Sequence, residues 1–271
     1  MSRKEASMYA NCTFTDAVAT GLTMPGAAPG PDTEGFIETI ETCGAVDGPG
    51  LRYVVFTRGC PLRCQYCHNP ETQGKPRGEI TTAKKVLADV KRYKPFLRRG
   101  GLTISGGEPL MQPQFVHAIM KGAKEAGIHT ALDTSGFLGA KASDELLENV
   151  DLVLLDIKSG LSSTYENVTG VRLSPTLDFA QRLDALGKAM WIRFVLVPGL
   201  TDSERNIEAV AKFVATLKHV DRVEILPFHK MGEHKYEAIG KTYQLANTLP
   251  PTENQIETAR ALFARHGVQA R

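Results

Sequence analysis

The feature that most constrains the fold is an alternation of strand-like and helix-like stretches after residue 50. Strand-like runs are predicted at residues 52–56, 102–104, 130–133, 152–157, 191–197 and 222–226. Helices are predicted at residues 82–93, 113–126, 143–148, 176–186, 203–217 and 252–266. The run at 152–157 is apolar on both faces, as in a parallel strand covered by helices. The pattern predicts an α/β protein and leaves open whether the parallel sheet is a partial barrel or an open doubly wound sheet.

Chemically distinctive residues lie within or directly after the predicted strands, mostly at their carboxyl ends. Taken in chain order they are Cys60, Cys64 and Cys67, then residues 105–109, Asp133, Asp156, Lys158, Arg193 and His229. Ligands of parallel α/β folds bind at the carboxyl ends of the strands. These side chains therefore predict one functional site at a single edge of the sheet.

Three of the five cysteines, Cys60, Cys64 and Cys67, fall within eight residues with the spacing C-x3-C-x2-C. This cysteine spacing has four interpretations: free thiols, a zinc site, haem attached through the C-x-x-C-H pattern at 64–68, or an iron–sulfur cluster. Structural zinc usually takes four ligands, and haem attachment would leave Cys60 unused. Iron–sulfur clusters are usually held by four thiolates, so three would leave one iron open to a substrate or cofactor. The spacing favours a cluster that carries out chemistry.

Composition limits the class of protein. The chain has 271 residues, of which 42% are hydrophobic and 23% charged, values typical of a globular domain. A net charge of +2 predicts no general attraction to nucleic acid or membranes. No apolar run approaches the roughly 20 residues that span a bilayer, and the first residues lack the apolar core of a secretion signal. We expect a cytoplasmic monomer, in which clustered cysteines are metal or redox ligands rather than disulfides.

Residues 1–34 are expected to form a flexible extension, because the stretch 25–31 is rich in Pro and Gly and the segment lacks periodicity. Cys12 lies in this extension and is expected to have no role. The globular domain is expected to span residues 35–271 and to open with a strand at 36–40. Residues 47–50, Asp-Gly-Pro-Gly, predict a turn that is either a simple hairpin connection or an exposed glycine ledge that another chain could approach.

Two groups of residues at the strand ends each have two interpretations, a structural role or contact with a ligand. Gly106 and Gly107 predict either a turn or bare backbone that an amino-acid amine could approach, with Glu108 as a nearby acceptor. Asp156 and Lys158 form either a surface ion pair or a pair of opposite charges for a zwitterionic ligand.

The remaining polar residues carry similar alternatives. Asp133 is either a helix cap or, together with Asp156, a ligand of a cation that prefers oxygen. His229 is either structural or in contact with a ligand. Arg193 lies inside a predicted strand and therefore requires a buried anion or a partner carboxylate.

Several short motifs occur along the chain: VDGPGLR at 46–52, GCPLRCQYCHN at 59–69, SGGE at 105–108, LDTSG at 132–136, LLDIK at 154–158, WIR at 191–193, VPG at 197–199 and LPFH at 226–229. In this order they resemble the glycyl-radical-enzyme activating enzymes of the radical S-adenosylmethionine (radical SAM) superfamily, especially those acting on pyruvate formate-lyase. The cysteine motif with Tyr66 indicates only the superfamily. Pro109 and Phe228 are small variations. The absence of a cysteine-rich, ferredoxin-like insert favours the pyruvate formate-lyase type.

The resemblance implies a partial (β/α)6 barrel, TIM-like and of the radical SAM type, with a [4Fe–4S] cluster on Cys60, Cys64 and Cys67. It also implies S-adenosylmethionine on the open iron. The residues implied to contact that cofactor are Tyr66, Cys67, His68, Gly107, Asp156, Ile157, Lys158 and His229. Asp133 and Asp156 are similar to ligands of a monovalent cation beside the cofactor carboxylate.

The implied activity is that of an oxidoreductase working under anaerobic conditions. Reductive cleavage of S-adenosylmethionine would make a 5′-deoxyadenosyl radical, which would take a hydrogen atom from one glycine of pyruvate formate-lyase. Reduced flavodoxin is the implied electron donor, and residues 47–50 are the implied ledge for the partner's glycine loop. The alternatives are the activation of another glycyl radical enzyme, radical SAM chemistry on a small molecule, and a non-enzymatic iron–sulfur or zinc regulator.

Overall fold

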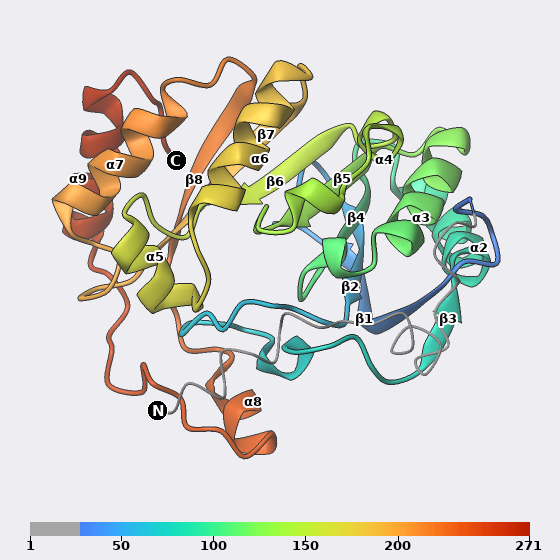
Figure 1. The fold of residues 1–271 in the computed structure, drawn as a ribbon, viewed down its shortest axis with the longest axis horizontal. Helices are drawn as coiled ribbons and strands as arrows, with labels where there is room; N and C mark the ends of the chain where they lie inside the picture. Colours follow the sequence, from blue (N-terminus) through green and yellow to red (C-terminus); the bar gives the residue numbers. More distant parts are fainter. Residues whose placement is uncertain (1–27) are drawn as a thin grey trace.

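The computed structural model describes residues 28–271, which build an eight-stranded sheet in the order β3-β1-β2-β4-β5-β6-β7-β8 (Figure 1). Its strands are β1 (Glu34–Gly44), β2 (Arg52–Thr57), β3 (Ile80–Thr82), β4 (Gly101–Gly106), β5 (Thr130–Thr134), β6 (Leu152–Asp156), β7 (Ala189–Leu196) and β8 (Val220–Pro227). β2 and the five strands from β4 to β8 pair in parallel, whereas β1 pairs antiparallel with β2 and β3. Because β3 and β8 are edges, the sheet is not closed, and the expected partial barrel is confirmed.

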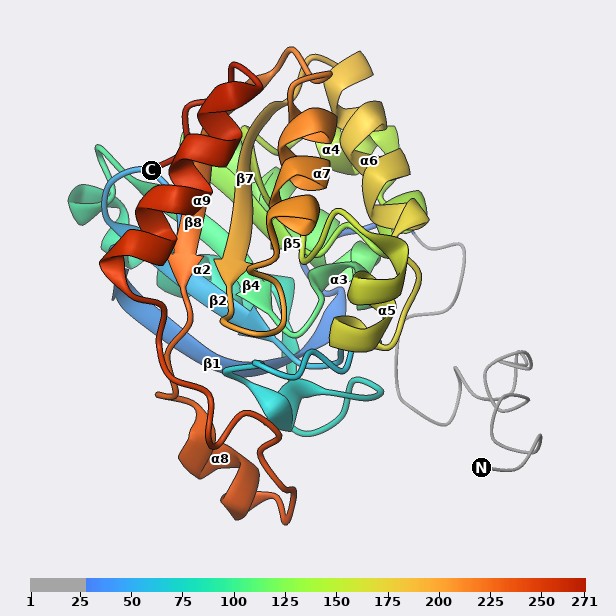
Figure 2. The ribbon, with the colours of Figure 1, turned by 90° about the vertical axis from the view of Figure 1, so that its left-hand side faces the viewer.

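Helices cover the outer face of this curved sheet, from α2 at one end to α9 at the other (Figures 1 and 2). The helices are α2 (Ala83–Tyr93), α3 (Pro113–Glu125), α4 (Asp144–Glu148), α5 (Ser162–Thr169), α6 (Ser174–Ala185), α7 (Glu204–Val214), α8 (Glu233–Ala238) and α9 (Glu253–Arg265). Every predicted strand and helix is present, with bounds shifted by a few residues. β3, α5 and α8 were not predicted. Within residues 28–271, no helix has the length and apolar character needed to cross a membrane.

Local signals set several helix ends. The side chain of Thr82 accepts a hydrogen bond from the Lys85 amide at 3.3 Å and caps α2. Ser203 precedes α7 without such a side-chain bond. Gly127 and Gly187 take positive φ angles of 67° and 66° after α3 and α6, where a left-handed residue ends the helix.

Alternate side chains of the parallel strands face opposite sides of the sheet. In β6, Val153 and Leu155 belong to the main core on the helix-covered side. Leu152 and Leu154 pack instead with Trp191 in a small inner cluster. The same inner positions become polar toward the carboxyl ends of the strands, and this change positions the candidate site.

The described end of the N-terminal segment packs on the domain. The carbonyl groups of Pro31 and Thr33 accept hydrogen bonds from the amides of Lys84 and Ala83 at 2.7 and 2.9 Å. Glu34 then begins β1. The rest of the predicted flexible extension, including Cys12, lies outside the described residues.

Residues 45–51 connect β1 to β2 as an antiparallel hairpin, so the Asp-Gly-Pro-Gly turn is a hairpin connection, and its role as a ledge for another chain stays a prediction. The turn lies at the amino end of β2, whereas the cysteines follow its carboxyl end. Val46 is 75% exposed, whereas Gly48 is buried. The Asp47 carbonyl accepts a hydrogen bond from Thr103 Oγ1 at 2.7 Å, which ties the turn to β4.

Gly50 provides a test of this turn. Its φ angle is +68°, and a Cβ there would lie 1.9 Å from the Arg99 carbonyl oxygen. We expect Gly50→Ala to lower the free energy of unfolding by about 3 kcal/mol or more, because left-handed strain and a backbone clash add. Gly267→Ala is the matched control, since its φ is +75° and its Cβ would meet nothing within 4 Å. Urea denaturation of the metal-free variants measures both, and equal losses would contradict the clash.

Candidate functional site

The three clustered cysteines lie in the loop after β2, and backbone hydrogen bonds hold this loop in place. Cys60 and Gly74 exchange two bonds of 2.9 Å, and the Cys67 amide donates to the Cys64 carbonyl at 3.2 Å. All three thiols are free. The described residues contain no group of three or more His, Cys, Asp or Glu side chains that could hold a single metal ion.

Burial governs the ionisation of these thiols. It raises the pKa of Cys64 to about 12, and it raises the pKa values of Cys60 and Cys67 as well. The neighbouring thiols act in the same direction on Cys60, which places the three groups within electrostatic reach of one another. The thiols therefore keep their protons at neutral pH, and a metal that binds here must displace them.

The end of α5 covers the loop on the side of Cys64. The amides of Arg63 and Gln65 donate to the carbonyl groups of Thr169 and Val168 at 2.7 and 3.0 Å. These bonds join two segments about a hundred residues apart in the chain. Figures 1 and 2 show the loop between α5 and α8.

The segment after β8 covers the loop on the side of Cys67. The rings of His68 and His229 lie 4.3 Å apart between centroids, and His68 Nε2 is 3.3 Å from the His229 carbonyl oxygen. A Cβ at Gly232 would lie 2.9 Å from the Cα of His68, so the two backbones are in close contact. Burial, followed by the charge of His229, lowers the pKa of His68.

Lys235 of α8 holds the segment after β8 against the cysteine loop. Its amine donates to Asn69 Oδ1 at 2.8 Å and to Glu71 Oε1 at 2.7 Å. Tyr236 and Tyr243 pack behind it in a small core that also contains Tyr66. Lys235, Tyr236 and Tyr243 were not among the predicted site residues, because α8 has only six residues and carries no periodic apolar pattern.

Gly107 lies against the cysteine loop. A Cβ at Gly107 would lie 2.3 Å from the Gly59 carbonyl oxygen and 3.1 Å from the Cβ of Cys60. The Gly107 amide donates to the Thr57 carbonyl at 2.9 Å. Only glycine allows the ends of β2 and β4 to approach this closely.

Glu108 does not serve as the expected acceptor for a ligand amine. Its carboxylate is fully buried and accepts hydrogen bonds from Leu110, Thr134 and Ser135 at the end of β5. Burial raises the pKa of Glu108, and the bonds from Ser135 and Thr134 oppose this rise. The side chain locks the loop after β4 onto β5, so the expectation of a ligand role is wrong.

Charged side chains gather on the inner face at the ends of β5, β6 and β7. Arg193 Nη1 lies 3.1 Å from Asp133 Oδ2, and Arg193 Nε lies 3.9 Å from Asp156 Oδ1. The predicted requirement for a partner carboxylate is therefore confirmed. Ser105 Oγ donates to Asp133 Oδ2 at 2.7 Å, whereas Asp133 Oδ1 is buried with no hydrogen-bond partner in the described chain.

The ionisation of this group reflects its burial. Burial raises the pKa of Asp133 to about 6, although Arg193 acts in the opposite direction. Burial lowers the pKa of Arg193, but the carboxylates of Asp133 and Asp156 outweigh this effect and raise it overall. The guanidinium group is therefore a permanent cation between two aspartates.

Lys158 extends the charged group toward the cysteines. Its amine lies 2.5 Å from Asp156 Oδ2 and 5.9 Å from the centre of the Tyr66 ring. Burial lowers the pKa of Lys158, but Asp156 raises it well above its ordinary value on balance. Tyr66 is buried, and its hydroxyl has no hydrogen-bond partner within residues 28–271. Ile157 differs from the other predicted site residues, because its side chain lies in the helix-side core.

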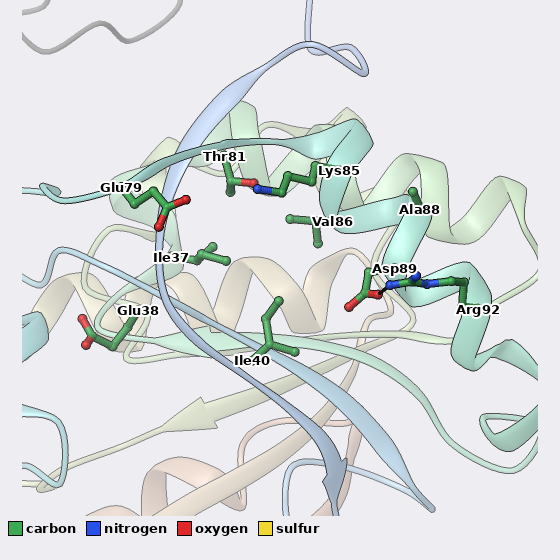
Figure 3. Close-up of a pocket in the computed structure, with 10 residues that line it drawn as sticks. All are labelled: Ile37, Glu38, Ile40, Glu79, Thr81, Lys85, Val86, Ala88, Asp89 and Arg92. Carbon is green, nitrogen blue, oxygen red and sulfur yellow. Dashed lines mark hydrogen bonds and ion pairs between the residues drawn. The ribbon is translucent and has the colours of Figure 1, made fainter.

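A groove of about 640 Å³ lies elsewhere, on the outer face between β1, β3 and α2 (Figure 3). Ile37, Ile40 and Val86 form its apolar part, and Glu38, Lys85 and Asp89 are among its charged residues. None of the predicted site residues lines this groove, so the sheet edge with the cysteines remains the candidate site.

Several known proteins are similar to this chain. The family model of the Radical SAM superfamily matches residues 54–213, and the chain belongs to that superfamily. Pyruvate formate-lyase-activating enzyme of Clostridium pasteurianum is 46% identical over 213 residues, which cover 78% of this chain and 89% of the relative. Pyruvate formate-lyase 1-activating enzyme of Escherichia coli K12 is 38% identical over 237 residues, covering 86% and 96%.

A solved structure agrees with these relatives. A domain of pyruvate-formate lyase-activating enzyme from Bacteroides vulgatus superimposes with a TM-score of 0.54 at 28% identity, covering 64% of this chain and 98% of that domain. Within its superfamily, the chain thus falls among the pyruvate formate-lyase-activating enzymes. This membership implies a [4Fe–4S] cluster and S-adenosylmethionine.

Glu108→Gln tests the structural role assigned to this carboxylate. Its two oxygens face donors from Leu110, Thr134 and Ser135, and a carboxamide would turn an NH2 group toward some of them. We expect a loss of about 2–3 kcal/mol in the free energy of unfolding, because buried donors lose their acceptor. The exposed Glu79→Gln is the control, with an expected change within about 0.5 kcal/mol. Denaturation curves that shift equally for both variants would contradict the role.

Proposed function

We propose that this chain activates pyruvate formate-lyase by generating a glycyl radical on it through reductive cleavage of S-adenosylmethionine. The single observation that supports this most is the joining of the three-cysteine loop, Gly107 and the charged group around Asp156 at one sheet edge. Identity to pyruvate formate-lyase-activating enzymes over most of the chain supports the choice of partner. The chain is proposed to act as a monomer, with reduced flavodoxin as electron donor.

Cys60, Cys64 and Cys67 are the proposed ligands of the [4Fe–4S] cluster. Three free thiols on one pinned loop fit a cluster that keeps one iron for a cofactor. When bound, the cluster supplies the electron that cleaves S-adenosylmethionine at its sulfonium. The chain itself binds, orients and shields the reacting groups.

Charged and aromatic groups beside the loop are the proposed contacts for S-adenosylmethionine. Lys158 and Asp156 offer opposite charges to its carboxylate and amine, and Gly107 offers backbone close to Cys60. The unpartnered hydroxyl of Tyr66 and the stacked rings of His68 and His229 fit its nucleoside part. Ile157 would contribute only through its backbone, since its side chain lies in the core.

The hairpin turn at residues 47–50 is the proposed ledge for the partner's glycine loop. Thr103 binds the carbonyl of Asp47 from the inner face of β4, so the turn reaches toward the barrel interior. Burial raises the pKa of Asp47, and the charge of Arg193 is the largest effect that opposes this rise. Asp47 therefore lies within electrostatic reach of Arg193. A glycine held here would be guided toward the charged end of the barrel.

Asp133 and Asp156 are the proposed ligands of a monovalent cation. Asp133 Oδ1 is buried without a hydrogen-bond partner in the described chain, which leaves an oxygen for such an ion. Arg193 already balances part of the two negative charges. The cation would complete this balance when the cofactor carboxylate arrives.

The radical activity has a direct spectroscopic test. Anaerobically reconstituted chain, S-adenosylmethionine, a reductant and pyruvate formate-lyase should give the EPR doublet of a glycyl radical. Cys64→Ala should abolish both the doublet and the cluster absorbance. Cys43→Ala should change neither, because Cys43 is exposed on β1. If the doublet formed only with another glycyl radical enzyme, that enzyme and not pyruvate formate-lyase would be the partner. If deoxyadenosine formed without any doublet, the result would favour a small-molecule substrate.

Cation dependence is tested by S-adenosylmethionine binding. We expect about tenfold weaker binding, or about 1.4 kcal/mol, when potassium is replaced by bulky tetramethylammonium at equal ionic strength. Asp133→Asn should remove this difference. Equal affinity of the unmodified chain in both buffers would show that Arg193 alone balances the two aspartates.

A further inference from the structure

Positive charge is concentrated around the outer side of the cysteine loop. We name as the basic rim the exposed residues Arg63, Lys75, Arg77 and Arg172. Residues 58–70, 72–78 and 167–177 contain no Asp or Glu. Glu71 interrupts the first two stretches, but Lys235 pairs with it. The nearest other acids in sequence, Glu79, Glu166 and Asp178, stand outside these stretches.

Backbone contacts bring the stretches of the basic rim together. Gly74, next to Lys75, exchanges two hydrogen bonds with Cys60. Arg63 Nη1 donates to the Cys60 carbonyl at 3.0 Å. A Cβ at Gly170 would lie 3.7 Å from the Cβ of Arg63, which brings the stretch with Arg172 alongside.

The same side of the loop is also the open one. The segment containing Gly232 and α8 covers Cys67, and the end of α5 covers the backbone beside Cys64. At Gly74, by contrast, a Cβ would meet no heavy atom within 4 Å. The backbone bonded to Cys60 is therefore reachable by a partner at the basic rim.

We propose that the basic rim is the docking surface of an acidic one-electron carrier protein, which delivers its electron to the cluster on the side of Cys60. This inference rests on the proposed function, which needs an external electron for each cleavage: the carrier is oxidised by one electron and the cluster is reduced by one. Complementary charge steers such encounters and raises association rates 10- to 1,000-fold at low ionic strength. A rim with three arginines and a lysine fits an acidic surface.

Charge reversal on the full-length, anaerobically reconstituted chain tests this surface. The variants are Arg63→Glu/Lys75→Glu/Arg77→Glu and the milder Lys75→Glu/Arg77→Glu, which keeps the bond from Arg63 to the loop. Stopped-flow bleaching of the cluster absorbance measures reduction by flavodoxin hydroquinone, used as the acidic probe. At low salt we expect reduction about tenfold slower or more in the triple variant, and a weaker salt dependence than in the unmodified chain.

Two controls separate docking from damage to the loop. Reduced methyl viologen, a small cation, should reduce both variants at least as fast as the unmodified chain. Reversal of three exposed lysines on α2 and at its start, Lys84→Glu/Lys85→Glu/Lys91→Glu, should leave the flavodoxin rate unchanged. The measurement contains no pyruvate formate-lyase, so its outcome is independent of whether a glycyl radical forms.

Three outcomes would overturn the proposal. In the first, flavodoxin reduces the rim variants at the unmodified rate. In the second, both reductants slow equally in both variants, which would assign the residues to holding the cluster. In the third, a duplex oligonucleotide binds the rim more tightly than flavodoxin and loses that binding in the variants, which would assign the surface to nucleic acid.

Discussion

The buried guanidinium of Arg193 is the interaction on which the candidate site depends. It extends from the inner face of β7 and meets carboxylates from the two preceding strands, β5 and β6. Removing one member of a buried charge pair typically costs about 3–5 kcal/mol, because the other charge is left without a partner. Arg193 therefore stabilises the neighbouring positions of Asp133 and Asp156 in the barrel. Their shared position then fixes Lys158, which pairs with Asp156.

A second constraint acts on the cysteine loop, which has little regular structure of its own. Distant segments hold it: Gly74 on one side, the end of α5 on another, and the segment from His229 to Lys235 on a third. These contacts are backbone hydrogen bonds, a contact between two rings, a close backbone approach and side-chain hydrogen bonds from Lys235, and together they restrain the loop. Because the loop already holds the cysteine side chains near their positions, they lose less conformational entropy when a cluster binds.

Sequence reasoning recovered the parallel strands and the edge at which the site lies, because hydrophobic periodicity and strand-end chemistry are local signals. It missed β3, α5 and α8, of which β3 and α8, with three and six residues, are too short to show a period. Glu108 was misassigned for a different reason. A glutamate after a strand has the same sequence signature whether it faces a ligand or the hydroxyls of Thr134 and Ser135.

Ile157 shows the limit of position-by-position inference. It lies between Asp156 and Lys158, yet successive side chains near a strand end point to opposite faces. Its side chain therefore belongs to the helix-side core while its neighbours form the charged group. A motif gives the order of residues but not the face of the sheet that each side chain occupies. That face is known only when it is known which alternate residues of the strand point inward.

The two proposed partner surfaces lie at opposite ends of β2. The Asp47 turn precedes this strand, and the cysteine loop follows it; six residues of extended chain span about 20 Å. An electron carrier at the basic rim would approach the cluster from outside, whereas a glycine loop at the turn would approach from the barrel interior. On these proposals, the two partner proteins would contact surfaces separated by the length of β2. Both could then bind one chain without competing for the same surface.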